Sequence, residues 1–395
     1  MAERGGTDTQ RAVVPASRSA TLRLGFACHW TSPRESTWSG TPWQLRRHLD
    51  PLADVVDVGS ELPAALRTPL RLAYARRGAG RWTSVWRHGT LTRAAVARDV
   101  DRRTRRAAPD VVLQIQDLGG TAAPAMVLQD LSYALLLDRY GRDGVPHFRA
   151  LGRRRIESLR RAQDRVYARA AVLLPMSRWL ADDLVAHGVP AHRVRVVHPG
   201  VNAAVPAGTP VPPRRRGPVR RLLLLGRDFD TKGGDQVVRA LAVLRRELGA
   251  TVSLTVAGPE RWPMRGDVPD GVEFLGPVSR ARAGELMDTH DLFVMPSRLE
   301  GFGIVFAEAL SRGLPCIGRD ACAMPEILDR ASGGLLVRSE APDELAALVV
   351  EALADDALYE ACAARADARR AHFSWDRAAR DVLAAAGTVV DGGRP

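Results

Sequence analysis

Short apolar runs alternate along the chain with longer segments in which apolar residues recur every three or four positions. The short runs have the length of buried strands, and the longer segments have the period of amphipathic helices. In the first half, the pattern predicts strands at residues 22–28, 54–58, 111–116, 126–128, 171–175 and 194–197. It predicts helices at residues 42–49, 87–106, 148–168 and 177–186. Such alternation is typical of a parallel sheet with helices on its faces.

A second alternating series follows residues 203–219, which are rich in proline and glycine and have no periodicity. Its predicted strands are residues 221–225, 252–257, 272–275, 292–295 and 316–317, and its predicted helices are residues 235–248, 280–289, 303–312 and 343–354. The predicted fold class is therefore α/β, with two doubly wound, Rossmann-like parallel-sheet domains. The expected divisions are a disordered or poorly ordered segment 1–19, a first domain 20–202, a linker 203–219, a second domain 220–370 and a final helix with tail 371–395.

Length and cysteine usage bound the class of protein. At 395 residues the chain is too long for one compact core and suits two domains of ordinary size. Its four cysteines show neither metal-ligand spacing nor the pattern of a disulfide framework, which favours a reducing cytoplasm. Residues 1–19 lack the apolar core of a signal peptide. No window approaches the ~20 consecutive apolar residues of a membrane-spanning helix.

The net charge of +12 comes largely from arginines in residues 67–106 and 149–169, where they recur between apolar residues as on basic amphipathic helices. Two interpretations stay open. These faces are solvated helix surfaces, or they contact an anionic membrane peripherally, at its inner face. Nucleic acid is not an expected partner, because the chain has no zinc finger, no aromatic RNA-binding signature and no identifiable helix-turn-helix.

The clearest candidate for a ligand site is residues 298–315, which read R-L-E-G-F-G-I-V-F-A-E-A-L-S-R-G-L-P. Gly301 and Gly303 leave the backbone free to approach a ligand where the next helix begins. Glu300 and Glu308 stand eight residues apart (308 − 300). At ~1.5 Å of rise per residue they are expected to reach different parts of one elongated ligand. A solvated surface role does not suit Glu308, since it lies inside an apolar run where an unpaired carboxylate is costly.

Lysine usage points to a second candidate. Among 57 basic residues the chain has a single lysine, Lys232, in a glycine-containing turn that follows the predicted strand 221–225. Gly226 and Arg227 open this turn, and a helix is expected after it, a layout that suits phosphate binding at the carboxyl edge of a parallel sheet. Taken alone, Lys232 would be an ordinary exposed residue at a helix start. Its combination with Arg227 and the Glu300 segment favours a functional role.

The same turn contains Asp228 and Asp230 in a D-x-D pattern that some glycosyltransferases use to hold a divalent metal. Aspartate also favours turns through its local hydrogen bonds. Beside Arg227 and Lys232 we interpret both carboxylates as turn formers. No metal and no other cofactor is therefore expected.

Together these two segments resemble those of the family-four retaining glycosyltransferases of the GT-B fold. The resemblance implies that Glu300 contacts the sugar of a nucleotide sugar, that Glu308 holds its ribose, and that Arg227 and Lys232 neutralise its diphosphate. It implies two domains facing a cleft, an acceptor-side first domain, a donor-binding second domain, and a final helix in residues 371–395 that crosses back. The implied donor-binding set is Gly40, Gly226, Arg227, Lys232, Gly301, Phe302, Gly303 and Glu308.

The catalytic residue of the acceptor side is less clearly indicated. Residues 36–42 resemble the small-residue loop that borders the reaction centre in these enzymes, although any strand-to-helix turn uses such residues. Many relatives have a histidine near the middle of the first domain, where this chain offers Asp117 and Asp130 instead. Asp130 is preferred because it follows an apolar strand at its carboxyl end. His29 is as compatible with a structural role as with a site role, and His198 suits a hinge turn.

The resemblance implies retaining transfer of a hexose from a UDP- or GDP-sugar to an acceptor hydroxyl. Two routes to retention stay open: the departing phosphate deprotonates the acceptor on the same face, or a short-lived covalent intermediate forms. Cleavage develops negative charge on the leaving diphosphate, which Arg227, Lys232 and the amides of residues 301–303 are placed to meet without a metal. The expected catalytic set is Glu300, Asp130, Arg227 and Lys232. The alternatives are another GT-B enzyme, such as a sugar-nucleotide epimerase or a phosphorylase, and a non-catalytic nucleotide-sugar or polyanion-binding protein. The sequence leaves the donor, the acceptor and the oligomeric state open.

Overall fold

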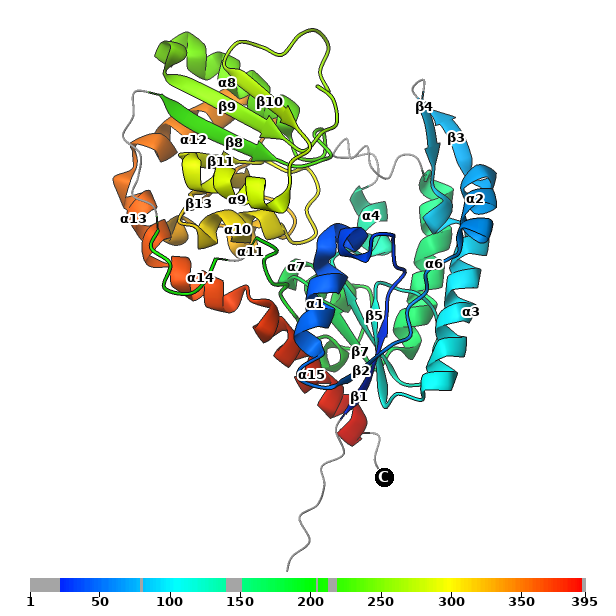
Figure 1. Ribbon diagram of the computed structural model, residues 1–395. Helices are drawn as coiled ribbons and strands as arrows, with labels where there is room; N and C mark the ends of the chain where they lie inside the picture. The colour runs from blue at the N-terminus through cyan, green and yellow to red at the C-terminus, as the bar shows by residue number, and fades with distance from the viewer. Residues whose placement is uncertain (1–21, 79–80, 140–150, 204, 212–218, 393–395) are drawn as a thin grey trace, which may run out of the picture.

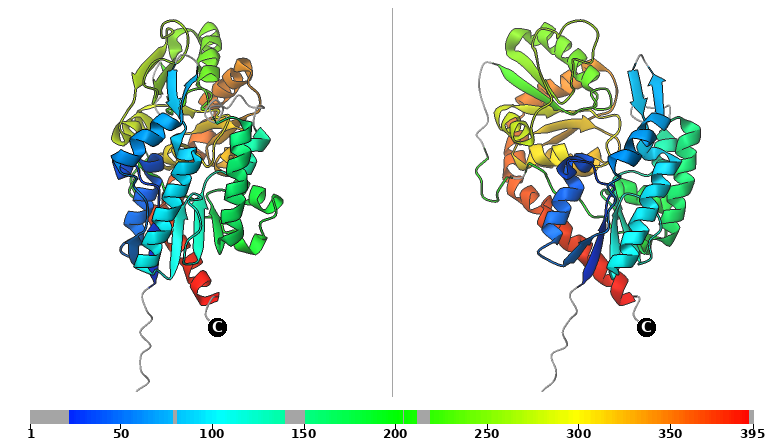
Figure 2. Two further views of the ribbon diagram at one scale, coloured as in Figure 1. Left: turned by 90° about the vertical axis from the view of Figure 1, so that its right-hand side faces the viewer. Right: turned by 45° about the vertical axis from the view of Figure 1, so that its right-hand side comes forward.

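The computed structural model describes residues 22–78, 81–139, 151–203, 205–211 and 219–392, which form two α/β units (Figure 1). The expected N-terminal segment 1–19 lies outside the described residues, as do residues 204 and 212–218 of the expected linker. Figure 2 shows the two units stacked one above the other, with the last helix running from the second unit along the first.

Five parallel strands form the sheet of the first unit, in the order β2-β1-β5-β6-β7. Their bounds are β1 Arg23–Ala27, β2 Asp54–Asp57, β5 Val111–Ile115, β6 Ala125–Gln129 and β7 Val172–Pro175. The helices of this unit are α1 Thr41–Leu49, α2 Ala64–Ala73, α3 Thr90–Ala107, α4 Tyr133–Arg139, α6 Arg153–Arg169 and α7 Arg178–Ala186. Every residue of β5, β6 and β7 is buried, as expected for parallel strands covered on both faces.

Alternate residues of the first strand pack against different helices. Phe26 belongs to the same buried cluster as Leu45 and Leu49 of α1, whereas Ala27 packs with Val96 and Val100 of α3. Because successive strand residues point to opposite faces, α1 and α3 cover opposite sides of the sheet. This arrangement leaves the strand ends free to carry polar side chains.

Six parallel strands form the second sheet, in the order β10-β9-β8-β11-β12-β13. Their bounds are β8 Arg220–Leu225, β9 Val252–Ala257, β10 Val272–Gly276, β11 Leu292–Val294, β12 Cys316–Arg319 and β13 Gly334–Val337. The helices that follow in chain order are α8 Gly234–Leu248, α9 Arg280–Thr289, α10 Ile304–Ser311, α11 Met324–Ile327, α12 Pro342–Ala354, α13 Asp356–Ala364, α14 Ala366–His372 and α15 Trp375–Gly392.

Helix α15 packs against α1 and β5 of the first unit, although it follows the second unit in the chain. Its buried face includes Val382, Ala385 and Ala386. At the start of the helix, a Cβ added to Gly200 would lie 2.5 Å from the Trp375 ring, so only glycine fits there. The two units are therefore joined both by the chain around Gly200 and by α15.

One predicted strand is wrong and several elements are additional. Residues 194–197 form a single bridge between Val194 and Leu173 rather than a strand, because the chain leaves the edge of β7 and turns toward the second unit. The structure adds α2, the antiparallel hairpin of β3 Ala75–Gly78 and β4 Arg81–Ser84, α4, β13 and three short helices near the end, α11, α13 and α14.

Helix α2 contributes no buried residue to the core. Leu66 and Leu72 of this helix are 51% and 71% exposed, and Arg67 and Arg71 lie beside them in sequence. The helix therefore shows solvent an apolar and basic surface of the kind that the sequence predicted for this region. Among the described residues, no helix combines the length and apolar character that crossing a membrane requires.

Candidate functional site

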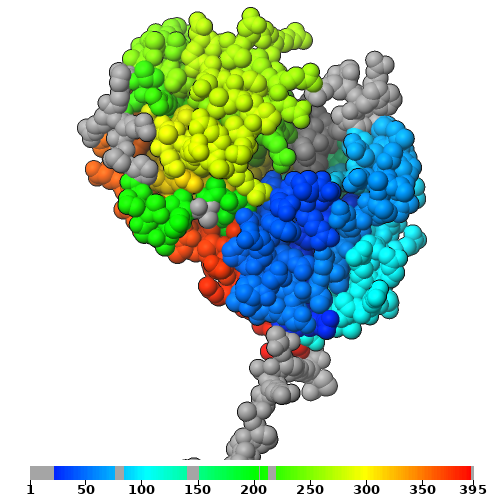
Figure 3. Space-filling model, in the orientation of Figure 1, coloured from blue at the N-terminus to red at the C-terminus, as the bar shows by residue number. Residues whose placement is uncertain are grey.

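A pocket of about 500 Å³ lies between the two units. The first unit contributes residues that follow β1, β5 and β6, and the second unit contributes residues that follow β8 and β11. The carboxyl ends of parallel strands thus face one another across the pocket, which is where open α/β sheets bind ligands. Figure 3 shows the dark blue segment that contains the 3₁₀ helix η1, Arg34–Gly40, lying against the second unit.

The two segments singled out in the sequence meet on the second-unit side of this pocket. Lys232 Nζ lies 2.5 Å from Glu300 Oε2, and Ser297 Oγ donates to the same oxygen over 3.4 Å. Lys232 is 22% exposed and Glu300 is 12% exposed, so the ion pair is mostly shielded from water. The cation expected to meet diphosphate is therefore paired with the carboxylate expected to meet sugar.

Two glycines allow the turn that contains Lys232 to pack closely on itself and against the end of β11. A Cβ added to Gly226 would lie 2.7 Å from Lys232 Cγ. Gly233 has a φ of +72°, and a Cβ there would overlap the carbonyl oxygen of Pro296. Inside the turn, Thr231 Oγ1 donates to Asp228 Oδ2 over 2.8 Å, which agrees with the interpretation of Asp228 as a turn former.

The loop before α1 joins the donor side to the first unit. Arg227 Nη2 donates to Ser39 Oγ over 3.4 Å, and Arg280 Nη2 donates to the carbonyl oxygen of Ser39 over 3.2 Å. Gly40 has a φ of +90°, and a Cβ there would overlap the Arg280 guanidinium. A side chain at position 40 would be strained by the positive φ and would displace the Arg280 guanidinium, while Arg227 reaches from the second unit to Ser39 of the first.

Glu308 lies in α10, at the hinge between the units. Its Oε1 accepts hydrogen bonds from the amides of Asn202 and Ala203 over 2.9 and 3.0 Å. Burial raises the pKa of Glu308, while these two amides oppose the shift. One carboxylate oxygen is therefore held by the chain that connects the units, and among the described residues Oε2 receives no hydrogen bond.

Phe302 turns its ring away from the polar pocket. The ring is 3% exposed and packs against His198 and Phe373, with ring centroids 5.5 and 5.8 Å away. His198 Nε2 also lies 2.7 Å from Glu326 Oε1. These contacts lock the loop between β11 and α10 onto the hinge, so only the backbone of Phe302 is available to a donor.

Asp130 packs against the loop that contains Glu300, and both line the pocket. A Cβ added to Gly301 would come within 2.9 Å of both the Asp130 backbone oxygen and its Oδ2. Burial raises the pKa of Asp130 to about 7, and the nearby Glu300 carboxylate adds to the shift while Lys232 opposes it. Among the residues that the structure describes, Asp130 has no ion-pair partner.

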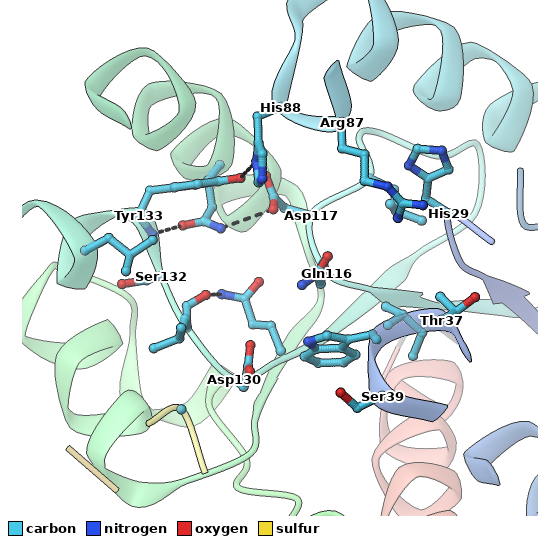
Figure 4. Close-up of a pocket in the computed structure, with 18 of the residues that line it drawn as sticks. His29, Thr37, Ser39, Arg87, His88, Gln116, Asp117, Asp130, Ser132 and Tyr133 are labelled. Atoms are coloured by element: carbon cyan, nitrogen blue, oxygen red, sulfur yellow. Dashed lines mark hydrogen bonds between the residues drawn. The ribbon is translucent and has the colours of Figure 1, made fainter. Parts of the chain in front are cut away.

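Asp117, the other carboxylate considered for this side, is committed to a structural network. Arg93 Nη2 lies 2.6 Å from Asp117 Oδ2, and Gln163 Nε2 donates to Asp117 Oδ1 over 3.2 Å. The Gln163 side chain in turn accepts from the amide of Tyr133. Figure 4 shows this network at one end of the pocket and Asp130 at the other.

The pocket also contains polar residues that the sequence did not single out. Arg87 and His88 lie in the short 3₁₀ helix η2, Trp86–His88, where the sequence predicted the start of a long helix at residue 87. His88 Nδ1 lies 3.1 Å from the Tyr133 hydroxyl. Burial, together with the Arg87 charge, lowers the pKa of His29 to about 4. In the sequence, the only local feature that marks this turn is Gly89, which follows His88 and ends it.

Comparison with known proteins gives a family for the second half of the chain. The model of "Glycosyl transferases group 1" matches residues 213–369. The D-inositol 3-phosphate glycosyltransferase of Jonesia denitrificans is 30% identical over 247 residues, which cover 56% of this chain and 58% of that protein. The phosphatidyl-myo-inositol mannosyltransferase of Mycolicibacterium smegmatis is 28% identical over 240 residues, covering 60% of this chain and 61% of that protein. The chain thus spans less than two thirds of the length of these relatives.

Solved structures share the fold over nearly the whole chain. WaaG, a glycosyltransferase involved in lipopolysaccharide biosynthesis, has a TM-score of 0.63 at 19% identity and covers 94% of this chain and 100% of its own. Anabaena HepE, solved with UDP and glucose, has a TM-score of 0.64 at 15% identity. The match covers 93% of this chain and 100% of HepE. A protein from Listeria monocytogenes, described as a putative UDP-N-acetylglucosamine 2-epimerase, has a TM-score of 0.57 at 14% identity. The match covers 95% of this chain and 98% of that protein. The resemblance seen in the sequence is confirmed: residues 213–369 match the group 1 glycosyltransferase family, and the chain has the GT-B fold.

Proposed function

We propose that the protein is a retaining glycosyltransferase that moves a hexose from a UDP- or GDP-sugar to an acceptor hydroxyl without a metal. The observation that carries the proposal is the Lys232–Glu300 ion pair, which lines the pocket beside Asp130. One partner of this pair suits a leaving diphosphate, and the other suits the hydroxyls of the sugar attached to it.

Diphosphate binding is assigned to the second unit. Lys232 lines the pocket and Arg227 contacts Ser39, which also lines it, so the two supply two positive charges. Gly303, with a φ of +95°, opens α10 so that backbone amides precede the helix. These groups are fixed before the ligand arrives, so they stabilise the growing charge without large rearrangement. Asp228 is engaged by Thr231, which supports its assignment as a turn former rather than a metal ligand.

The reacting sugar is assigned to the part of the pocket that Glu300 and Asp130 line together. Arrival of the diphosphate draws Lys232 from Glu300, and the freed carboxylate then accepts hydrogen bonds from sugar hydroxyls. With a pKa of about 7, Asp130 is partly protonated at neutral pH and donates a hydrogen bond to the sugar from the other side. Glu308 Oε2 is assigned to the ribose.

Bond exchange then follows from this placement. The bond between the anomeric carbon and the phosphate oxygen breaks, and the electron pair leaves with the nucleoside diphosphate toward Arg227 and Lys232. The acceptor hydroxyl attacks the same face, and its proton passes to the departing phosphate. The new bond keeps the anomeric configuration of the donor.

The test is a panel of UDP- and GDP-sugars in the presence of a chelator, read by thermal shift and by release of nucleoside diphosphate. The proposal expects at least one donor both to raise the melting temperature and to be cleaved, with at least ~100-fold slower cleavage in Glu300→Gln. Glu285→Gln is the matched control, since Glu285 is an exposed residue of α9 that pairs with Arg282.

Other outcomes would identify the alternative classes. Conversion of the sugar without release of diphosphate would indicate an epimerase. A thermal shift without any turnover would indicate a binding protein. Cleavage that needs magnesium would return Asp228 and Asp230 to consideration as ligands.

A further inference from the structure

The chain passes between the two units twice, and the two passages lie against each other at the hinge. The first passage contains His198 and Val201, and the second contains His372 and Phe373 at the end of α14, where the chain returns to the first unit in α15 (Figure 1). The Val201 amide donates to the Phe373 carbonyl oxygen over 2.9 Å. Because both covalent connections run through this place, a change in their contact alters how the units sit relative to each other.

Two histidines, one from each passage, also contact each other. His198 Nδ1 lies 2.9 Å from His372 Nε2, and His198 Nε2 lies 2.7 Å from Glu326 Oε1 of α11. An ionised carboxylate only accepts hydrogen bonds, so His198 Nε2 carries a hydrogen and donates it to Glu326. In the neutral His198 ring Nδ1 is then an acceptor, and His372 Nε2 donates to it. Glu326 thus sets the direction of both hydrogen bonds.

This pair of rings tolerates one additional proton but not two. With one extra proton, either His198 or His372 is cationic, and the two facing nitrogens still share a hydrogen. With two, both nitrogens carry a hydrogen and both rings are positive across a contact of 2.9 Å, which then has no acceptor. The hydrogen bond between the two passages is therefore lost in acid.

Other polar contacts place the pair at the junction of several elements. Arg377 of α15 donates to the carbonyl oxygen of His198. The Arg178 amide at the start of α7 donates to Glu326 Oε2 over 2.7 Å, so the carboxylate that binds His198 also binds the first unit. A change in His198 is therefore felt by helices of both units.

The charges around the pair disfavour its full protonation. Burial lowers the pKa of His372. The positive charges of Arg377, His198 and Arg178 act in the same direction, and Asp381 opposes them. The folded state thus favours the neutral His372 ring. Its contribution to stability is complete above about pH 6.5 and is lost as the pH falls below that value.

The same hinge contact supports the loop that contains Glu300. Phe302 stands two residues after Glu300, and its ring lies 5.5 Å from the His198 ring and 5.8 Å from the Phe373 ring between centroids. The Phe302 side chain is almost fully buried by these contacts. The position of the Glu300 loop is therefore tied to His198 through Phe302.

We propose that His198 and His372 are positioning residues that hold the units and the Glu300 loop in place at neutral pH and release both when the two rings are protonated. Acid then opens the hinge and weakens the donor site through Phe302, although neither histidine touches the donor. The hinge device goes beyond the proposed function, and only its effect on nucleotide binding rests on that function.

The experiment combines two measurements at pH 7.5 and pH 5.5. Small-angle X-ray scattering gives the radius of gyration without nucleotide, and calorimetric titration gives the affinity for UDP and GDP in a chelator. The wild-type protein is compared with His372→Gln, whose amide nitrogen can donate to His198 Nδ1 but does not titrate. His192→Gln is the matched control, since His192 is exposed in the 3₁₀ helix η3, Ala191–Arg193.

At pH 7.5 the three proteins should have the same radius of gyration and the same affinity. At pH 5.5 the wild-type protein and His192→Gln should expand, whereas His372→Gln should stay compact. The affinity of His372→Gln should fall about 3- to 10-fold less than that of the wild-type protein, as expected for one hydrogen bond. The nucleotide phosphate and Asp130, with its pKa of about 7, also titrate, but equally in all three proteins.

Three results would overturn the inference. The first is a wild-type radius of gyration that does not change between the two pH values, a result that needs no variant. The second is the same pH dependence of His372→Gln and wild type in both measurements. The third is loss of the far-ultraviolet circular dichroism signal at pH 5.5, which would attribute the expansion to unfolding. Failure of the proposed function is distinct, because it appears as absence of UDP and GDP binding at pH 7.5 while the scattering difference persists.

Discussion

Replacing Glu300 by glutamine should tighten the binding of UDP or GDP while it slows transfer. Lys232 Nζ is held 2.5 Å from Glu300 Oε2. A nucleoside diphosphate must compete with this carboxylate for the ammonium group. Glutamine keeps the size and a hydrogen-bond acceptor but removes the charge, so Lys232 becomes available at lower cost.

The magnitude follows from how far the pair is shielded. Exposed ion pairs contribute ~0–1 kcal/mol, whereas breaking a fully buried pair costs ~3–5 kcal/mol. With exposures of 22% and 12%, Lys232 and Glu300 lie between these limits, and we take about 1–2 kcal/mol. Removing that cost should lower the Kd of the nucleoside diphosphate about 5- to 30-fold. Lys232→Ala should instead raise it about 10- to 150-fold, because a charge-assisted contact is lost.

The assay is calorimetric titration of UDP and GDP in a chelator, with the double variant completing a thermodynamic cycle. The gain from Glu300→Gln should disappear when Lys232 is alanine, since there is then no ammonium to release. Glu285→Gln serves as the surface control. Weaker nucleotide binding in Glu300→Gln, or a gain that persists without Lys232, would refute competition between the carboxylate and the diphosphate.

Three further predictions concern the hinge, the first-unit wall and the outer surface. Glu308→Gln should weaken UDP or GDP binding about 10-fold in the same titration with little loss of stability, because the glutamine oxygen can still accept from the hinge amides; unchanged affinity would remove the ribose assignment. Asp130 has a folded pKa of about 7, above its unfolded value, so its contribution to stability is present in full below about pH 4 and is lost as pH rises to 7. Asp130→Asn should therefore raise the denaturant midpoint relative to wild type at pH 8 but much less at pH 4.5. A lower midpoint at pH 8 would contradict the inference that burial disfavours the charged form of Asp130. If α2 contacts membrane, replacing the exposed Leu66 and Leu72 by glutamate should reduce cosedimentation with anionic vesicles, and equal cosedimentation of both proteins would favour a solvated surface.

The two sheets were predictable because their strands are continuous apolar runs bounded by turn residues. The residues of β8 and β9 form such runs, and the sequence predicted their bounds to within one residue. Short elements with weaker patterns were missed, including the hairpin of β3 and β4 and the edge strand β13. The run at residues 194–197 has the composition of a strand but lies where the chain departs for the second unit, which only tertiary structure reveals.

The same division applies to the candidate site. Glu300, Lys232 and Glu308 were visible in the sequence because glycine turns and an otherwise lysine-free composition mark them. Their mutual contacts were not visible, since 68 residues separate Lys232 from Glu300 and their meeting depends on the order of strands in the sheet.

Retaining transfer without a metal is tested most directly by proton NMR of donor cleavage in a chelator. The protein is incubated with α-linked UDP- and GDP-hexoses, and the anomeric proton of the sugar released to water is followed before mutarotation. The expected result is equimolar nucleoside diphosphate and an initially α-configured sugar, with cleavage at least ~100-fold slower in Glu300→Gln. An initially β-configured sugar, or cleavage that appears only when magnesium is added, would contradict it.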